Sequence, residues 1–73
     1  MLIRQAKTRG GLYLMELHRN PSGTFDVVEY KRGNVTGRAC NYQADEFDKR
    51  IADSLKYDSI RFIETPVSKG NIE

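Results

Sequence analysis

The sequence predicts a small α+β domain: an antiparallel β-meander of three to five strands with one α-helix packed on one face, in the order (β)βββαβ. Two turn sequences, Asn20-Pro21-Ser22-Gly23 and Gly33-Asn34, divide residues 12–42 into three strand-like segments. Apolar residues then recur at helical spacing over residues 43–57. Because the helix follows a run of strands, we expect two layers, a sheet and a helix packed on it.

The first turn is typical of a three-residue hairpin loop. Pro21 fixes φ for a type I turn, and Gly23 tolerates the positive φ of the bulge that follows. The loop sets Asn20 opposite Thr24 and predicts the pairs Arg19–Phe25, Leu17–Val27, Met15–Glu29 and Tyr13–Lys31. The second turn is interpreted as a two-residue loop with Gly33 first, which predicts the pairs Arg32–Val35, Glu29–Arg38, Val27–Cys40 and Phe25–Tyr42.

Side chains alternate across a sheet, so these registers define two faces. The predicted core face holds Tyr13, Met15, Leu17, Phe25, Val27, Cys40 and Tyr42. The opposite face holds Leu12, Leu14, Glu16, His18, Asp26, Val28, Tyr30, Arg32, Val35, Gly37, Ala39 and Asn41. The first set is nearly all apolar in its middle, and we therefore expect the helix to pack there.

The segments on either side of the meander are predicted from weaker patterns. Residues 1–7 are interpreted as an edge strand that forms a hairpin with residues 12–19, or otherwise as a loose basic arm. The helix over 43–57 presents an apolar stripe, with Asn41 near its N-cap and the (i, i+4) pairs Asp45–Lys49 and Glu46–Arg50. The stripe consists of Ala44, Phe47, Ile51, Ala52 and Leu55. Residues 59–64 read as a final strand, parallel to residues 12–19 after a right-handed crossover or paired with the N-terminal segment.

Length and composition indicate one domain over residues 1–64, followed by a disordered C-terminal tail over 65–73. The 73 residues bring the chain near the lower size limit for a single core, so dimerisation would help it. Cys40 is the only cysteine, which favours a reducing compartment and a core role beside Val27. With no long apolar run and no secretory signal at the start, we expect a cytoplasmic protein that does not associate with membranes.

No combination of residues predicts catalysis, a cofactor or a metal. His18 is opposite Asp26 in the predicted register and two residues from Glu16, and we interpret it as part of a solvated cross-strand pair because no nucleophile lies beside it. The carboxylates Asp45, Glu46, Asp48 and Asp53 are interpreted as a solvated helix face. The glycines match neither the Walker nor the dinucleotide-binding pattern.

The first functional hypothesis is a small non-enzymatic protein-binding module, acting as an accessory protein, an inhibitor or a homodimer. Its basis is the apolar content of the sheet face that a single helix cannot cover, since contiguous exposed apolar patches usually mark interfaces. The predicted protein-binding residues are Leu12, Leu14, Val28, Tyr30 and, at the rim, Arg32. A competing interpretation is that the N-terminal segment or the tail folds over this face.

The alternative hypothesis is binding of DNA or RNA. Residues 1–38 contain seven Lys and Arg residues against three acids, and residues 39–73 contain five against seven. The predicted nucleic-acid-binding residues are Arg4, Lys7, Arg9, Lys31 and Arg38. Some DNA-binding modules, such as integrase arm-binding domains, use a three-stranded sheet backed by a helix, and the element order is similar. However, such modules bind DNA with the sheet face that here is apolar and partly acidic.

Overall fold

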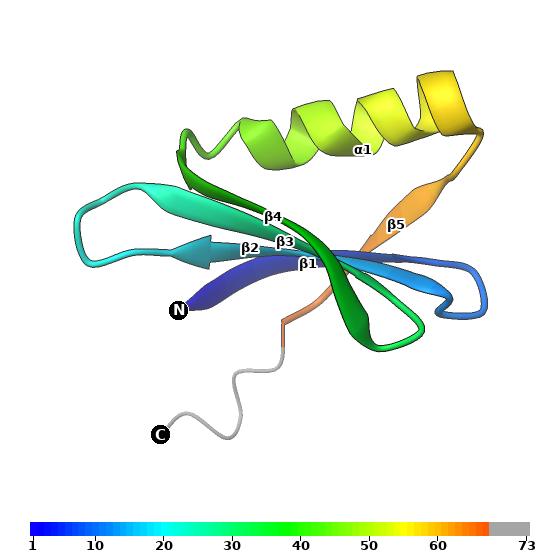
Figure 1. Ribbon diagram of the computed structural model, residues 1–73, viewed down its shortest axis with the longest axis horizontal. Helices are drawn as coiled ribbons and strands as arrows, with labels where there is room; N and C mark the ends of the chain where they lie inside the picture. Colours follow the sequence, from blue (N-terminus) through cyan, green and yellow to red (C-terminus); the bar gives the residue numbers. More distant parts are fainter. Residues whose placement is uncertain (68–73) are drawn as a thin grey trace.

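The computed structural model describes residues 1–67, and these form a five-stranded antiparallel sheet with one helix on one side (Figure 1). The elements are β1 (Leu2–Thr8), β2 (Tyr13–Arg19), β3 (Phe25–Lys31), β4 (Asn34–Tyr42), α1 (Glu46–Asp58) and β5 (Phe62–Thr65). The strand order is β4-β3-β2-β1-β5. The predicted α+β class, the meander and the single helix are therefore confirmed.

The N-terminal segment is a strand of the sheet, as predicted. It forms a hairpin with β2, but it is not an edge strand because β5 pairs along its other side, antiparallel. Of the two pairings predicted for the last strand, the one with the N-terminal segment is therefore correct. The strand spans Phe62–Thr65 and not 59–64. The other residues of the predicted tail, 68–73, lie outside the described residues.

The β2–β3 hairpin has the predicted register along its whole length. Leu17 is opposite Val27 and Met15 is opposite Glu29, and the loop closes with a 2.8 Å hydrogen bond from Asn20 N to Thr24 O. Gly23 has φ +91°, the left-handed conformation that the bulge of this loop requires.

The predicted β3–β4 turn is wrong by one residue. The two turn residues are Arg32 (φ 53°) and Gly33 (φ 82°), so that Lys31 pairs with Asn34. Positive φ at both positions defines a type I′ turn, whose twist matches that of the flanking strands. A non-glycine residue rarely adopts this conformation, and the sequence pattern alone gave no reason to place Arg32 in it.

Two irregularities in β4 change the register further. Pairing shifts by one residue between Tyr30 and Glu29 and again between Val27 and Phe25, so that Val27 faces Ala39. The predicted pairs Arg32–Val35, Glu29–Arg38 and Val27–Cys40 are therefore wrong, while the pair Phe25–Tyr42 is confirmed. As a consequence, Ala39 lies in the core, although it was assigned to the opposite face, and Cys40 is exposed.

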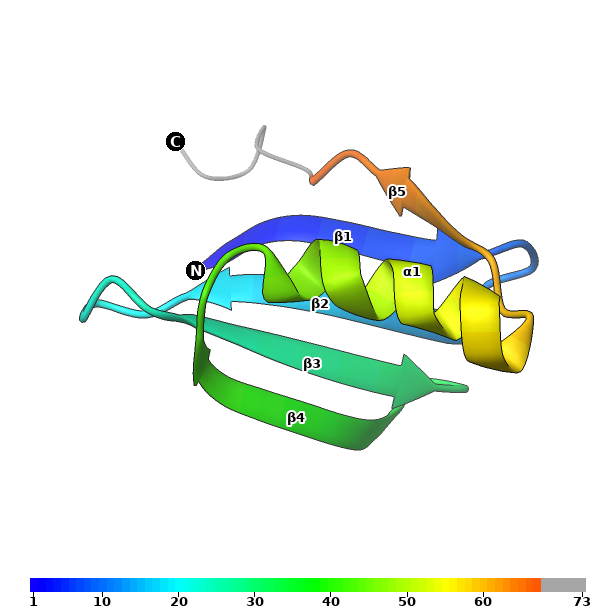
Figure 2. The ribbon, with the colours of Figure 1, turned by 90° about the horizontal axis from the view of Figure 1, so that it is seen from above.

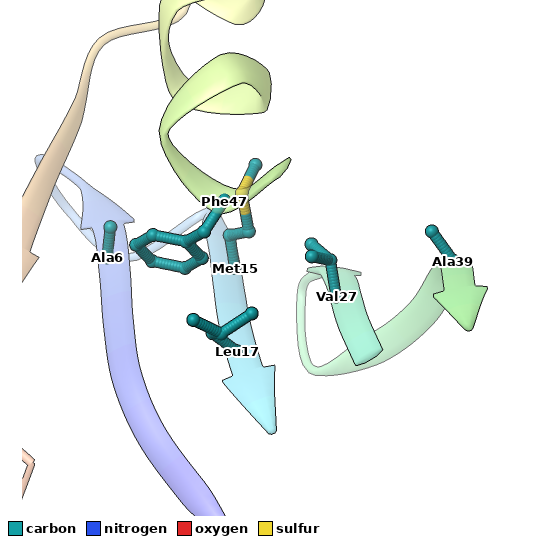
Figure 3. Close-up of a cluster of buried hydrophobic side chains, with 6 residues drawn as sticks. All are labelled: Ala6, Met15, Leu17, Val27, Ala39 and Phe47. Carbon is teal, nitrogen blue, oxygen red and sulfur yellow. The ribbon is translucent and has the colours of Figure 1, made fainter. Parts of the chain in front are cut away.

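The core lies between α1 and the sheet, over the central strands. Phe47 of α1 is fully buried against Ala6, Met15 and Leu17, and the cluster continues to Val27 and Ala39 (Figure 3). Ile3, Phe25, Ile51 and Phe62 pack around it half-buried. Seen from above, α1 lies over β1 and β2, and β4 forms the edge of the sheet that the helix does not cover (Figure 2).

The helix begins later than predicted and has a narrower buried stripe. Its N-cap is Asp45 and not Asn41, and the exposed fraction of Leu55 is 45%. Ala44 and Ala52 are also exposed, which leaves Phe47 as the only fully buried helix residue. Both predicted (i, i+4) ion pairs are present, Asp45–Lys49 at 3.8 Å and Glu46–Arg50 at 2.9 Å.

Candidate functional site

The sheet face opposite α1, here called the open face, is not covered by any helix or strand of the described chain (Figure 1). Cross-strand pairing arranges its side chains in rows that run across the strands. The turn-end row contains Val35, Tyr30, Leu14, Lys7 and Ile63, in the order of the strands from β4 to β5. The middle row contains Arg38, Val28, Glu16, Gln5 and Thr65, and a third row contains Asp26, His18 and Leu2.

The turn-end row is the most apolar part of the open face. Val35 and Ile63 are 55% and 52% exposed, and they flank the half-buried Tyr30 and Leu14. Leu12 extends the same surface beyond the start of β2, with 38% of its area exposed. Aliphatic and aromatic side chains on an uncovered sheet face provide a surface that another chain can bury.

Three of the five predicted protein-binding residues, Leu14, Val28 and Tyr30, share the open face. The other two lie at its end: Arg32 N donates a 2.8 Å hydrogen bond to Leu12 O, so these residues are opposite each other where the hairpin turns begin. Val28 is 2% exposed, yet it is not part of the core cluster beneath α1. Its own neighbours on the open face therefore bury it.

A hydrogen-bonded cluster around Glu16 covers Val28. Tyr30 Oη donates to Glu16 Oε1 at 3.0 Å, and His18 Nε2 donates to the same oxygen at 2.9 Å. Because Glu16 is the cross-strand partner of Val28, this hydrogen bond brings the Tyr30 hydroxyl close to the position of Val28. Burial and the hydrogen bond to Glu16 raise the pKa of the Tyr30 hydroxyl, which therefore stays protonated and remains a donor.

Asp26, in the third row, contacts several polar groups around it. Asn20 Nδ2 donates to Asp26 Oδ1 at 2.8 Å and Asn41 N donates to it at 3.1 Å, and together they lower the pKa of the carboxylate. Arg38 lies 3.9 Å from the other oxygen. His18 is opposite Asp26, as the register predicted, but its hydrogen bond goes to Glu16.

His18 and Cys40 do not form a catalytic pair. They lie on β2 and β4, with β3 between them, a separation of roughly 10 Å for two strand spacings. A nucleophile and its base need to be within hydrogen-bond reach. Within residues 1–67, no group of three or more His, Cys, Asp or Glu side chains has a geometry that could hold a metal ion.

The predicted nucleic-acid-binding residues do not share one surface. Arg4 lies on the helix side of the sheet, where its guanidinium contacts Asp48 at 2.9 Å and Glu64 at 2.7 Å and stacks 4.7 Å above the Phe47 ring. These two carboxylates raise the pKa of Arg4. Lys7 and Arg38 lie on the open face. Arg9 is in the β1–β2 turn, and Lys31 at the end of β3 lies 5.7 Å from the centre of the Tyr13 ring.

Three of the predicted residues, Lys7, Arg9 and Lys31, belong to a basic region at the turn end, where the β1–β2 and β3–β4 turns lie together (Figure 1). Because α1 runs back toward these turns, it brings Lys56 in its last turn and Arg61 to the same end. The bases gathered there are Lys7, Arg9, Lys31, Arg32, Lys56 and Arg61. Lys56 and Arg61 can be assigned to this group only once the helix direction is known.

Comparisons of the chain with protein-family models, with curated proteins and with solved structures give no match. In the described part of the chain, α1 is the only helix, and it is too short and too polar to cross a membrane. The geometry of the open face is therefore the basis for a functional proposal.

Proposed function

We propose that this chain is a small non-enzymatic binding module that engages a protein partner through the open face. The observation that supports the proposal is the one-sided architecture: a five-stranded sheet has its single helix on one side, and the turn-end row exposes Val35 and Ile63 on the other. Tyr30 and Leu14 lie between them, and Arg32 lies at the edge of the surface. Tyrosine and arginine are the residue types that most often anchor protein interfaces.

The polar cluster beside this row is compatible with an interface. Interfaces combine an apolar centre with a rim of hydrogen-bonding and charged groups. The open face has this composition, since the turn-end row borders Glu16 and Arg38 in the middle row, and His18 lies in the row beyond. No residue of the row makes an ion pair within the described chain, so a partner could bury the row without breaking one.

A photo-crosslinking residue at position 30 tests the proposal, and the same residue at position 57 provides a matched control. Tyr57 is also a tyrosine, is 70% exposed and lies on α1, away from the open face. We expect protein adducts from position 30 and few from position 57, with the position-30 adducts reduced at least about fivefold by Leu14→Ser, the equivalent of roughly 1 kcal/mol of interface energy. Equal adduct yields at both positions, or none at position 30, would contradict the proposal.

The second candidate is binding of DNA or RNA by the basic region at the turn end, favoured by the convergence of Lys7, Arg9 and Lys31 with Arg32, Lys56 and Arg61. Random-sequence duplex and single-stranded oligonucleotides titrated at low and moderate salt distinguish the two candidates. Phosphate binding predicts saturable association that weakens steeply with salt and is lost on reversing the charges of Arg9 and Lys31. Reversing Lys49, on the outer side of α1, is the control that should have no effect.

A further inference from the structure

We propose that the partner of the open face is a second copy of this chain, related by a two-fold axis that runs parallel to β3 within the interface. This inference rests on the proposed function and specifies its partner. In a two-fold interface the same surface lies on both sides, so it must be complementary to itself. The distribution of charge on the open face meets this condition for the axis along β3.

The complementarity follows from the positions of β2 and β4 on either side of β3. A two-fold rotation about an axis along β3 sets β4 of one copy over β2 of the other. In the middle row, Arg38 then faces Glu16 of the second copy, twice in the dimer. In the turn-end row, Val35 faces Leu14 of the second copy, and the two Tyr30 rings meet on the axis.

Arg38 is exposed, and Glu16, whose side chain is 16% exposed, keeps one carboxylate oxygen without a partner among the described residues. The Arg38 side chain is 55% exposed, and its ion pair within the described chain is a long 3.9 Å contact with Asp26. The hydrogen bonds that described residues make to the Glu16 side chain both end on Oε1, which leaves Oε2 for a donor from the second copy. Asp26 would also lie near Asp26 of the second copy, but hydrogen bonds from Asn20 and from the Asn41 backbone already stabilise its negative charge.

Two other two-fold axes through the same face place like charges together in the middle row. An axis along β2 would set Glu16 against Glu16 of the second copy, and an axis across the strands through the middle row would set Arg38 against Arg38. Like charges that face each other in an interface oppose association. Of these three axes, the one along β3 pairs opposite charges in the middle row.

The expected interface is small. Three strands about 4.8 Å apart and roughly 23 Å long present a projected area on the order of 350 Å². With side-chain relief this corresponds to roughly 1,000 Å² of total buried surface, the lower end of specific interfaces. We therefore expect a reversible dimer with a dissociation constant of about 1–100 μM.

Sedimentation velocity on two charge-reversed variants, alone and mixed, tests the arrangement. Arg38→Glu and Glu16→Lys should each weaken the homodimer at least about tenfold, because each places like charges in contact twice. An equimolar mixture should form a heterodimer about as tight as the wild-type dimer, since both positions then pair opposite charges. One ion pair is the native one, and in the other the two charges are exchanged. Contacts within one chain cannot produce this restoration. Lys49→Glu is the control that should dimerise normally.

A second pair of variants serves if Glu16→Lys does not fold. In a Cys40→Ser background, Val35→Cys and Leu14→Cys should form a disulfide with each other on mixing, faster than either forms one alone. A wild-type protein that is monomeric at about 500 μM would overturn the inference, and adducts from position 30 to a different protein would then leave the proposed function standing. A dimer that is insensitive to all these variants, or one that forms only with oligonucleotide present, would overturn the inference as well.

Discussion

Replacing Phe47 by alanine removes the one fully buried side chain that attaches α1 to the sheet. The Phe47 side chain is 0% exposed and packs on Ala6, Met15 and Leu17 (Figure 3). The Arg4 guanidinium lies 4.7 Å from the centre of its ring. Transfer of a phenylalanine side chain from water to the core contributes roughly 1.5–3 kcal/mol. The cavity that alanine leaves adds to this cost, because an open β-sheet cannot collapse fully into it, and Phe→Ala in cores costs about 3–5 kcal/mol in total.

That cost is large for a chain of this size. A stability of 0.05–0.15 kcal/mol per residue gives roughly 4–11 kcal/mol for 73 residues. Phe47→Ala should therefore remove at least about a quarter of the free energy of unfolding and lower the Tm by roughly 12–40 °C. Ile51→Ala, at a half-buried position one turn later, should cost less, and Leu55→Ala, at a position 45% exposed, should cost about 1 kcal/mol or less.

Urea denaturation followed by far-UV circular dichroism measures this series of free energies. The m-value should stay constant, so that the shift in midpoint reports stability directly. The order Phe47 > Ile51 > Leu55 is the essential result. If Leu55→Ala costs as much as Phe47→Ala, α1 packs with a wider stripe than the structure shows, and the argument from burial fails.

Three further variants test separate features. Arg4 holds the pKa of its two carboxylate partners, Asp48 and Glu64, below their ordinary values of 3.8 and 4.5. A carboxylate whose pKa is lower in the folded state than in the unfolded state stabilises the fold at pH values above the unfolded pKa. This stabilisation is lost as the pH falls through the folded pKa. Arg4→Met should therefore flatten the loss of stability below about pH 4.5 in urea melts between pH 7 and 2. The exposed thiol of Cys40 should react with a disulfide reagent in the folded protein, whereas moving it one position, in Ala39→Cys/Cys40→Ala, should protect it; equal rates would contradict the register of β4. Arg32→Asn should raise the free energy of unfolding by about 0.5–1 kcal/mol, because asparagine tolerates the left-handed conformation better.

The first hairpin could be predicted residue by residue because its loop sequence permits few geometries. A proline, then a serine, then a glycine fix the φ values of a three-residue loop, and the loop fixes the register of both strands. The alternation of Met15, Leu17 and Val27 then identifies the face beneath the helix, which the structure confirms. The turn sequence and the pattern of apolar residues predict the same register for this hairpin, so the two signals support each other.

The second hairpin could not be predicted in this way because the alternation of apolar and polar residues in the sequence does not reveal a bulge. Its turn begins at Arg32, which adopts a conformation that most residues avoid. Two further shifts in β4 then move the pairing back, so that Phe25 meets Tyr42 as predicted even though the pairs between are displaced. Bulges of this kind are common on edge strands, where they hinder pairing with another sheet.

For the candidate site, the sequence placed Leu14, Val28 and Tyr30 on one face correctly, because the β2–β3 register sets their positions. It could not predict the ion-pair partners of Arg4. Arg4 reads as part of a basic arm, but the crossover of α1 and β5 brings two carboxylates to it from positions 44 and 60 residues away in the chain. Partners this distant depend on the tertiary fold and not on any local pattern.

The open face contains side chains that are buried within a single chain and side chains that are exposed. The first group contributes to folding, and the second is available for binding. Val28 is buried by Tyr30 and Glu16 within a single chain, so changing Val28 or Glu16 disturbs the fold whether or not a partner is present. Val35 and Ile63 are more than half exposed, so the single chain gains little from them. Polar replacement of Val35, which faces the second copy in the proposed dimer, should therefore weaken association while leaving the free energy of unfolding of the single chain nearly unchanged. A partner that buries the whole open face would gain most of its apolar contact area from Val35, Ile63 and Leu12, because these are the apolar side chains that the described chain leaves most exposed there.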